Sequence, residues 1–291
     1  MPVRTTVAMM PSDIPLLTWP DLLGRSRPMP DATIAYGDDA FQKADVWLPA
    51  GDGPFPTVLM VHGGCWTTSI ADRTLMNWIA DDLRKEGIAV WNIDYRGVDR
   101  PGGGYPGTFL DAAMASDALA ANAERFNLDL RRIVTVGHSA GGHLALWLGG
   151  RPKLPAGSPL RTACPLPIAH VISLGGLPDL EATAASPDNG CGTDVVGQLV
   201  GAPSTKRPDI YADTSVPRLL PIGVPQDLVN GHEDSIIPIR LATGYVAQAE
   251  KAGDPVALHI VPATGHVELV APETAAWAEA KRLIRAALKA S

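Results

Sequence analysis

Long apolar runs and an excess of basic charge are both missing from this chain. The longest apolar stretches, such as Thr57–Val61, fall far short of the roughly 20 residues that span a bilayer, so we expect no membrane partner. Lys and Arg number 24 against 31 Asp and Glu, which gives a formal net charge of −7, and no basic stripe is present. This charge balance excludes a dedicated nucleic-acid-binding protein, because such proteins contact phosphates through clustered Lys and Arg.

Cysteine is also scarce, with only Cys65, Cys164 and Cys191 among 291 residues. An odd, small number in a chain of this length argues against a disulfide framework and favours a reducing compartment. A Cys164–Cys191 bridge stays open, because both residues lie in loops rich in Pro and Gly that could approach each other. The N-terminal residues lack a basic flank followed by an apolar run, so no secretory signal is expected. The sequence therefore predicts a cytoplasmic protein.

Motifs for metals and nucleotides are missing as well. The histidines have neither H-E-x-x-H spacing nor a C-x-x-C partner, and the residues 102–104 are glycines without a G-x-G-x-x-G pattern. We therefore predict no metal and no cofactor.

Short apolar runs do alternate with longer segments of helical periodicity, which is typical of βα units around a mainly parallel sheet. The composition, 46% hydrophobic and 19% charged, suits a chain that buries a large core. A hairpin at the sheet edge is expected near Ile34 and Val46, and a last helix should bury Trp277 and Ile284. The predicted strands are Thr57–His62, Ile88–Tyr95, Ile133–Gly137, His170–Leu174, Gln226–Asn230 and Ala257–Val261.

The domain organisation follows from this alternation. No linker divides the chain, so residues 1–291 are predicted to form one α/β domain. Two irregular stretches rich in Pro, residues 151–168 and 177–221, interrupt the pattern. Long irregular insertions in a compact domain are commonly lids or binding loops, and we predict a small lid from these two.

One motif carries a candidate nucleophile. Gly137–Gly141 reads G-H-S-A-G, directly after an apolar strand and at the start of a helix. A serine on such a sharp strand-to-helix turn needs small neighbours, and the turn exposes its Oγ. Ser139 is therefore the predicted nucleophile, with the amide of Ala140 at the helix N-terminus as an oxyanion donor. His143, one turn further on, is expected to be a packed helix residue.

A second glycine turn, His62–Trp66, follows an earlier strand and reads H-G-G-C-W. Paired glycines let consecutive amides face a common point, which suits binding of developing negative charge. The amides of Gly64 and Cys65 are thus predicted to complete an oxyanion hole, while the Cys65 thiol is expected to be structural.

Together the two motifs, with Asp94–Arg96 and the Gly102–Tyr105 loop, resemble the esterase, lipase and kynurenine-formamidase-like branch of the α/β-hydrolase superfamily. The resemblance implies the α/β-hydrolase fold, with a sheet of about eight strands flanked by helices. In many relatives the turn reads H-G-G-G, and here Cys65 replaces the third glycine. Trp66, Tyr105 and His138 are candidates to line the substrate pocket.

The same fold orders its catalytic residues along the chain as Ser, then Asp or Glu, then His. His266 follows the last predicted strand, and Asp234 lies in a G-H-E-D-S-I-I-P segment after the preceding strand, similar to the acid-bearing segment of relatives. A neutral imidazole can take the Ser proton, and a carboxylate fixes its tautomer. Glu233 and Asp227 stay open as rivals of Asp234, whereas Glu268 and Asp179 are expected at the surface or in the lid.

The predicted activity is that of a serine hydrolase that cleaves a small-molecule carboxylic ester through an acyl-enzyme. The first alternative is an arylformamidase acting on an N-formyl amide, suggested by the Trp of the H-G-G-x-W turn. A proline-type peptidase and a non-catalytic receptor on the same fold are further alternatives. Acyl and alcohol preference, lid geometry, pathway and any homo-oligomer are left open by the sequence.

Overall fold

The computed structural model describes residues 15–289, so most of the N-terminal stretch that bears on a secretory signal lies outside the described residues. The sheet consists of β1 (Ala32–Ala35), β2 (Lys43–Trp47), β3 (Phe55–Val61), β4 (Ala89–Ile93), β5 (Leu128–His138), β6 (His170–Leu174), β7 (Gln226–Gly231) and β8 (Val256–Val261). The helices are α1 (Trp19–Leu23), α2 (Asn77–Lys85), α3 (Gly107–Phe126), α4 (Ala140–Gly150), α5 (Leu180–Ala184), α6 (Asp194–Val200), α7 (Ile239–Ala252) and α8 (Ala275–Lys289).

The strands form one sheet in the order β1-β2-β4-β3-β5-β6-β7-β8. The first two neighbour pairs, β1 with β2 and β2 with β4, are antiparallel, and all the others are parallel. Every predicted strand is present, including the edge hairpin, in which Ala35 pairs with Lys43. The expected α/β-hydrolase architecture of about eight strands is confirmed.

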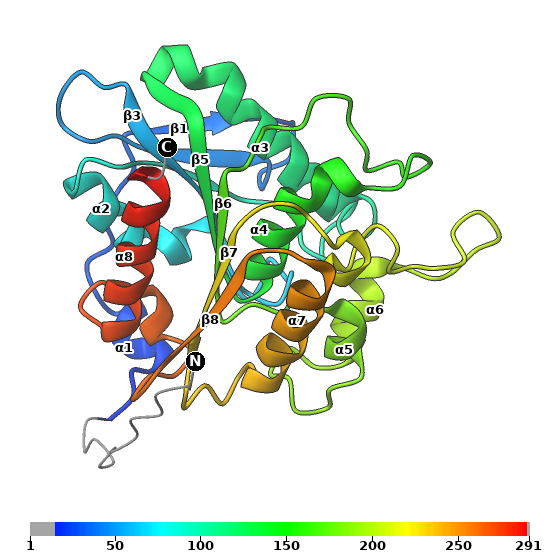
Figure 1. Ribbon diagram of the computed structural model, residues 1–291. Helices are drawn as coiled ribbons and strands as arrows, with labels where there is room; N and C mark the ends of the chain where they lie inside the picture. Colours follow the sequence, from blue (N-terminus) through cyan, green and yellow to red (C-terminus); the bar gives the residue numbers. More distant parts are fainter. Residues whose placement is uncertain (1–14, 290–291) are drawn as a thin grey trace.

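Helices cover both faces of the sheet (Figure 1). On one face α3, α4 and α7 pack together with α5 and α6, and the α4 residues are all buried. On the other face lie α1, α2 and α8, and α8 buries Trp277 and Ile284 as predicted. Near-continuous burial of β3 and β4 follows from this double cover, which explains their unbroken apolar sequences.

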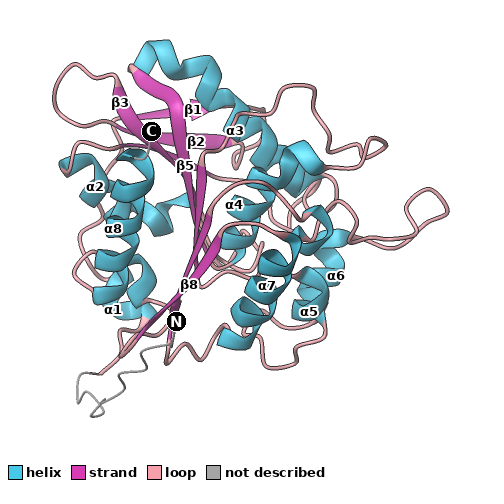
Figure 2. Cartoon of the chain, viewed as in Figure 1, coloured by secondary structure: helices cyan, strands magenta, loops and turns pink. Residues whose placement is uncertain are grey.

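The two insertions differ in structure (Figure 2). Residues 151–168 form a loop with one short 3-10 helix at Arg151–Lys153, whereas residues 177–221 carry α5, α6 and a second 3-10 helix at Val216–Leu219. A hairpin closed by the Ser204–Arg207 bridge also belongs to the second insertion. A lid function for these segments stays a prediction.

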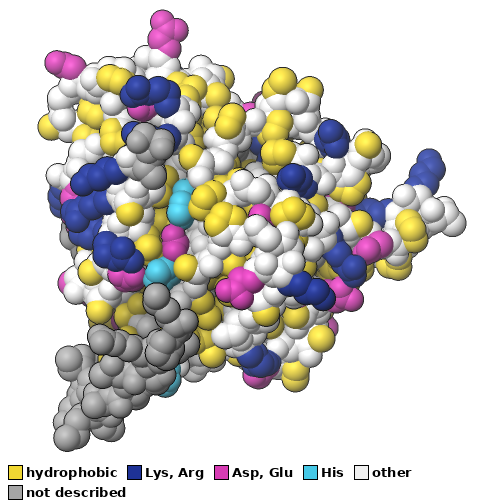
Figure 3. Space-filling view, viewed as in Figure 1, with side chains coloured by type: hydrophobic (Ala, Val, Ile, Leu, Met, Phe, Trp, Pro, Cys, Tyr) yellow, Lys and Arg dark blue, Asp and Glu magenta, His cyan; other side chains and the backbone are white. Residues whose placement is uncertain are grey.

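Three features of the structure concern what the chain could bind: the apolar character of its helices, its surface charge and the grouping of its metal-binding side chains. Within residues 15–289 no helix combines the length and the apolar character needed to cross a membrane. On the face shown in Figure 3, acidic side chains are interspersed with basic ones. The same described part of the chain contains no group of three or more His, Cys, Asp or Glu side chains arranged to hold a metal ion.

Candidate active site

Ser139 occupies a strained turn between β5 and α4. Its backbone has φ 54° and ψ −121°, in a region that costs a non-glycine residue about 1–3 kcal/mol. A Cβ on Gly141 would lie 2.2 Å from the Val61 carbonyl oxygen, so only glycine lets α4 approach β3 this closely. The Ser139 amide donates to the Leu174 carbonyl oxygen at 2.8 Å, which ties the turn to the end of β6. Packing of the elements around it thus holds the serine in an unfavourable conformation.

The glycine turn after β3 meets the Ser139 turn directly. Gly64, Cys65 and Trp66 have φ values of 108°, 52° and 53°, which reverse the chain sharply. A Cβ on Gly63 would lie 3.0 Å from the Ser139 Cβ. The amides predicted to stabilise an oxyanion, those of Gly64, Cys65 and Ala140, therefore belong to two turns packed too closely for a side chain at Gly63.

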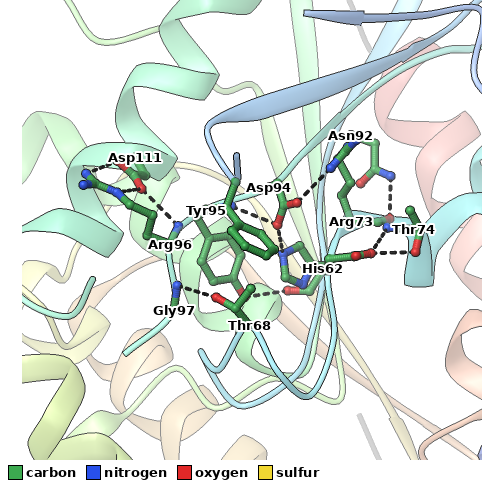
Figure 4. Close-up of polar contacts among 12 residues, drawn as sticks. His62, Thr68, Arg73, Thr74, Asn92, Asp94, Tyr95, Arg96, Gly97 and Asp111 are labelled. Carbon is green, nitrogen blue, oxygen red and sulfur yellow. Dashed lines mark hydrogen bonds and ion pairs between the residues drawn. The ribbon is translucent and has the colours of Figure 1, made fainter. Parts of the chain in front are cut away.

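A buried polar network around His62, the first residue of the glycine turn, holds the turn in place (Figure 4). The His62 Nε2 lies 2.9 Å from the Asp94 Oδ1, and the other oxygen of Asp94 accepts from the Arg73 Nη1 at 2.9 Å. The Tyr95 ring stacks on the His62 ring with centroids 4.4 Å apart, and its hydroxyl donates to the His62 carbonyl oxygen at 3.0 Å. Because both the ring and the carbonyl group of His62 are hydrogen-bonded, the start of the glycine turn is held in position.

His266 and Asp234 come from the loops after β8 and β7, which are adjacent parallel strands. The His266 Nδ1 donates to the Asp234 Oδ2 at 2.7 Å, and both side chains are almost fully buried. The other Asp234 oxygen accepts from the amides of Ile236 and Ile237, both at 2.9 Å. Three donors thus fix the carboxylate, and the carboxylate fixes which imidazole nitrogen carries the proton.

The two rival carboxylates lie elsewhere. Glu233 accepts from the Thr264 amide at 2.9 Å and does not contact His266. Asp227, within β7, lies between His170 and His259 at 2.7 and 2.6 Å. Of the three candidates, the structure brings Asp234 to the imidazole.

Ser139 and His266 line a common cavity of about 620 Å³, together with Gly64, Cys65 and His138. Among the described residues no hydrogen bond joins the Ser139 hydroxyl to the His266 imidazole, and such bonds commonly tighten only when substrate binds. The arrangement can deliver a serine oxygen, a base and backbone donors to one bound group.

His138 lies against the catalytic candidates. Its Nε2 donates to the His266 carbonyl oxygen at 3.2 Å, and the two rings lie 4.4 Å apart. Burial, helped by the neighbouring His266, holds the pKa of His138 well below its usual range. His138 is therefore a neutral ring that packs against His266 and lines the cavity, and its contact with substrate stays a prediction.

Two predicted pocket residues are placed elsewhere. Trp66 is 0% exposed and does not line the cavity, because its ring packs edge-on against His143 at 5.5 Å in the core. Tyr105 borders a separate cavity of about 810 Å³, where Arg207 lies 3.5 Å above its ring and Asp213 accepts from its hydroxyl. The structure therefore does not bring these two predicted side chains to the cavity that holds Ser139 and His266.

The cysteine pairing also differs from expectation. Cys65 forms a disulfide with Cys191, 126 residues away, and Cys164 is free and exposed. Cys191 belongs to the second insertion, and its neighbour Gly190 lines the cavity. The disulfide therefore links the insertion to the glycine turn, which a Cys164–Cys191 bridge would not do.

Sequence reasoning missed two residues at this site. Trp19, in α1, lines the cavity, although no motif surrounds it. Glu268, expected at the surface or in the lid, is only 5% exposed, and its Oε2 accepts from the Gly265 amide at 2.9 Å. Its position two residues after His266 was the only available signal.

Comparisons with known proteins place these observations in a family. The BD-FAE family profile matches residues 44–247, which is more than half of the chain. The probable carboxylic ester hydrolase LipM of Mycobacterium tuberculosis is 26% identical over 251 residues, which cover 81% of this chain and 56% of that protein. The isoprenylcysteine alpha-carbonyl methylesterase ICME of Arabidopsis thaliana is 32% identical over 114 residues, covering 39% of this chain and 26% of that protein.

A solved structure described as a truncated form of a carbohydrate esterase from gut microbiota has a TM-score of 0.71 at 18% identity. That alignment covers 90% of this chain and 98% of the other, and it shows a shared fold. The chain spans about half or less of the length of the two curated relatives. Because the profile matches more than half of the chain, the chain belongs to the BD-FAE family, and it has an α/β-hydrolase fold.

Proposed function

We propose that this chain is a serine hydrolase that cleaves a small-molecule carboxylic ester through an acyl-enzyme intermediate. The observation that carries the proposal is that Ser139, on its strained turn, shares a cavity with His266, whose Nδ1 is held by Asp234 at 2.7 Å. The curated relatives named as a carboxylic ester hydrolase and a methylesterase support the same reaction class.

In this mechanism Ser139 attacks the ester carbonyl while the His266 Nε2 takes its proton. Asp234 stabilises the imidazolium that forms and keeps the reactive nitrogen facing the serine. Negative charge develops on the carbonyl oxygen, and the amides of Gly64, Cys65 and Ala140 act as donors to it. Each such donor contributes about 3 kcal/mol of transition-state stabilisation.

The tetrahedral intermediate then collapses. His266 returns the proton to the leaving alcohol, and the acyl group stays on the Ser139 oxygen. A water molecule, deprotonated by the same imidazole, attacks the acyl-enzyme, and His266 returns that proton to the Ser139 oxygen as the acid is released. Because one imidazole must accept and donate in turn, its orientation by Asp234 matters in both half-reactions.

An arylformamidase activity remains the alternative, because the two motifs also resemble those of kynurenine formamidases. Its particular sequence support was Trp66, a side chain that packs in the core rather than in the cavity wall. The ester reaction is preferred for that reason. Both reactions use the same serine, so substrate comparison separates them.

The proposal also includes the predicted lid, the small-molecule partner and the cellular location. The insertions 151–168 and 177–221 form a lid, and the partner is a small ester rather than a nucleic acid or a membrane. A cytoplasmic location stays a prediction, but the Cys65–Cys191 disulfide weakens the part of it that rested on the cysteine count, because disulfides persist in oxidising compartments.

The test is hydrolysis of p-nitrophenyl esters beside N-formylkynurenine by wild type and Ser139→Ala, with fluorophosphonate labelling of both. Rapid ester turnover and labelling that both vanish in Ser139→Ala support the proposal. A preference for the formamide selects the alternative. If wild type turns over neither substrate and is not labelled, the serine-hydrolase mechanism is wrong.

A further inference from the structure

The N-terminal segment of residues 15–28 forms part of the wall of the active-site cavity. Trp19, Leu23 and Arg27 line the cavity beside Ser139 and His266. The family profile begins at residue 44, so this wall lies outside the matched region. Figure 1 shows α1 on the same side of the sheet as α8.

The segment is anchored to the body of the domain at several points. Leu22 is completely buried in the core on the α8 side of the sheet. The Trp78 Nε1 donates to the Ser26 carbonyl oxygen at 3.1 Å, and the Asn77 Nδ2 donates to the Pro28 carbonyl oxygen at 2.9 Å. This wall is therefore a fixed element of the structure.

One buried carboxylate joins the wall to the loop that carries His266. The Glu268 Oε2 accepts from the Gly265 amide at 2.9 Å, and its Oε1 accepts from the Leu17 amide. Because the same side chain holds both backbones, the position of the wall is coupled to the position of the imidazole.

Trp19 presents its ring to both imidazoles. Its centroid lies 6.1 Å from that of His138 and 6.3 Å from that of His266, with interplanar angles of 73° and 80°. Both are edge-to-face arrangements, which are favourable for aromatic rings. The ring thus occupies the space directly beside His266.

The chemistry of ester cleavage defines which part of the substrate occupies that space. The imidazolium must protonate the leaving alkoxide, so the alcohol portion lies on the His266 side, within hydrogen-bond reach of the imidazole. The carbonyl oxygen lies instead toward the glycine turn. A side chain beside His266 therefore contacts the alcohol portion rather than the acyl portion.

We propose that Trp19 is a specificity-determining residue that contacts the alcohol portion of the ester and, with Leu23, favours a non-polar alcohol larger than methanol. Leu23 lines the same wall and is 45% exposed, so it offers apolar surface that a substrate can cover. The inference rests on the proposed function.

The experiment varies the two halves of the ester separately. One series is n-alkyl acetates from methyl to hexyl, and the other is methyl esters of straight-chain acids from acetic to octanoic. Hydrolysis is followed by titration of the released acid for wild type, Trp19→Ala and Trp19→Phe. Met29→Ala is the matched control, because Met29 lies just beyond the segment, is 71% exposed and does not line the cavity.

We expect Trp19→Ala to lower kcat/KM for hexyl acetate at least about tenfold more than for methyl acetate, mainly through KM. Trp19→Phe should recover part of the loss, and the acyl series and Met29→Ala should follow wild type. An equal loss on all substrates, or a change confined to the acyl series, would overturn the inference. If wild type hydrolyses neither series, the proposed function itself fails.

Discussion

Asp234 accepts a hydrogen bond from the His266 Nδ1 at 2.7 Å, across two loops that follow adjacent parallel strands. This contact favours Asp234, the acid predicted from the sequence, over its rivals Glu233 and Asp227. It also fixes the tautomer in which Nε2 is free to accept a proton.

Asp234→Asn is expected to lower kcat by about 10,000-fold, because an amide at this position favours the wrong imidazole tautomer. The measurement is steady-state hydrolysis of a p-nitrophenyl ester, with circular dichroism to check folding. Asp227→Asn serves as control, since its carboxylate contacts His170 and His259 instead. Similar losses in both variants would count against Asp234 as the orienting residue.

Asp94→Asn should disturb the glycine turn, although the Asp94 side chain is buried beneath the turn and does not contact the substrate. The carboxylate holds both His62 and Arg73, and displacing backbone donors by even 1 Å costs about 100-fold in rate. We therefore expect a fall in kcat of that order with KM little changed. Asp129→Asn, which weakens a pair with the exposed Arg131 far from the glycine turn in sequence, is the comparison, and an unchanged kcat in Asp94→Asn would refute the supporting role.

Stability should fall as the pH is lowered from about 6.5 to about 4, in part because of His143. Burial lowers the pKa of His143 to about 4, so between these values the unfolded chain binds a proton that the folded chain does not. This protonation favours unfolding, and the stability it removes is about 3 kcal/mol once the pH reaches 4.

Urea unfolding of wild type and His143→Gln across this pH range measures that contribution. The glutamine can still donate to the Thr214 carbonyl oxygen that His143 contacts at 2.8 Å. The free energy of unfolding should fall less steeply with decreasing pH in His143→Gln. Parallel curves for the two proteins would show that His143 is not the group responsible.

Removal of the disulfide should destabilise the fold. Cys191→Ser opens a covalent loop whose ends are 126 residues apart, and loss of a native disulfide typically costs between about 2 and 5 kcal/mol, with the chain-entropy value for a loop of this size near the upper end. Thermal unfolding is the measurement, and wild type treated with a dithiol reductant should resemble the variant. Cys164→Ser should leave the melting temperature unchanged, and equal effects of the two substitutions would be inconsistent with the pairing.

Most of the sheet could be predicted from the sequence because its strands are short apolar runs, of which the inner ones such as β3, β4 and β6 are mostly buried and the edge strands β1 and β8 are partly exposed. The exception is the start of β5, which begins at Leu128 rather than Ile133. Residues 129–132 include three charged side chains and are not buried, and only Leu128 and Asp129 of this part pair with β3 before the register shifts at Pro56–Thr57 and skips residues 130–132. The local hydrophobic pattern predicts which residues are buried, but it does not predict which strands pair.

The candidate site divides in a similar way. Ser139 and the glycine turn could be recognised because strained backbone requires small residues at fixed spacing. Trp66 was misplaced because proximity to a motif does not determine where a side chain packs. Trp19 and the Cys65–Cys191 pair depend on contacts between distant segments, for which a single sequence gives no spacing rule.

The disulfide has a further consequence, which concerns the covalent topology of the chain. Residues 65–191 form a closed ring that contains Ser139, whereas Asp234 and His266 lie on the open tail beyond it. A protease cut in the 151–168 loop would fall inside the ring, so the two fragments would stay joined until the bond is reduced. A cut between residues 191 and 234 would instead leave no covalent link between Ser139 and the segment bearing the acid and the base.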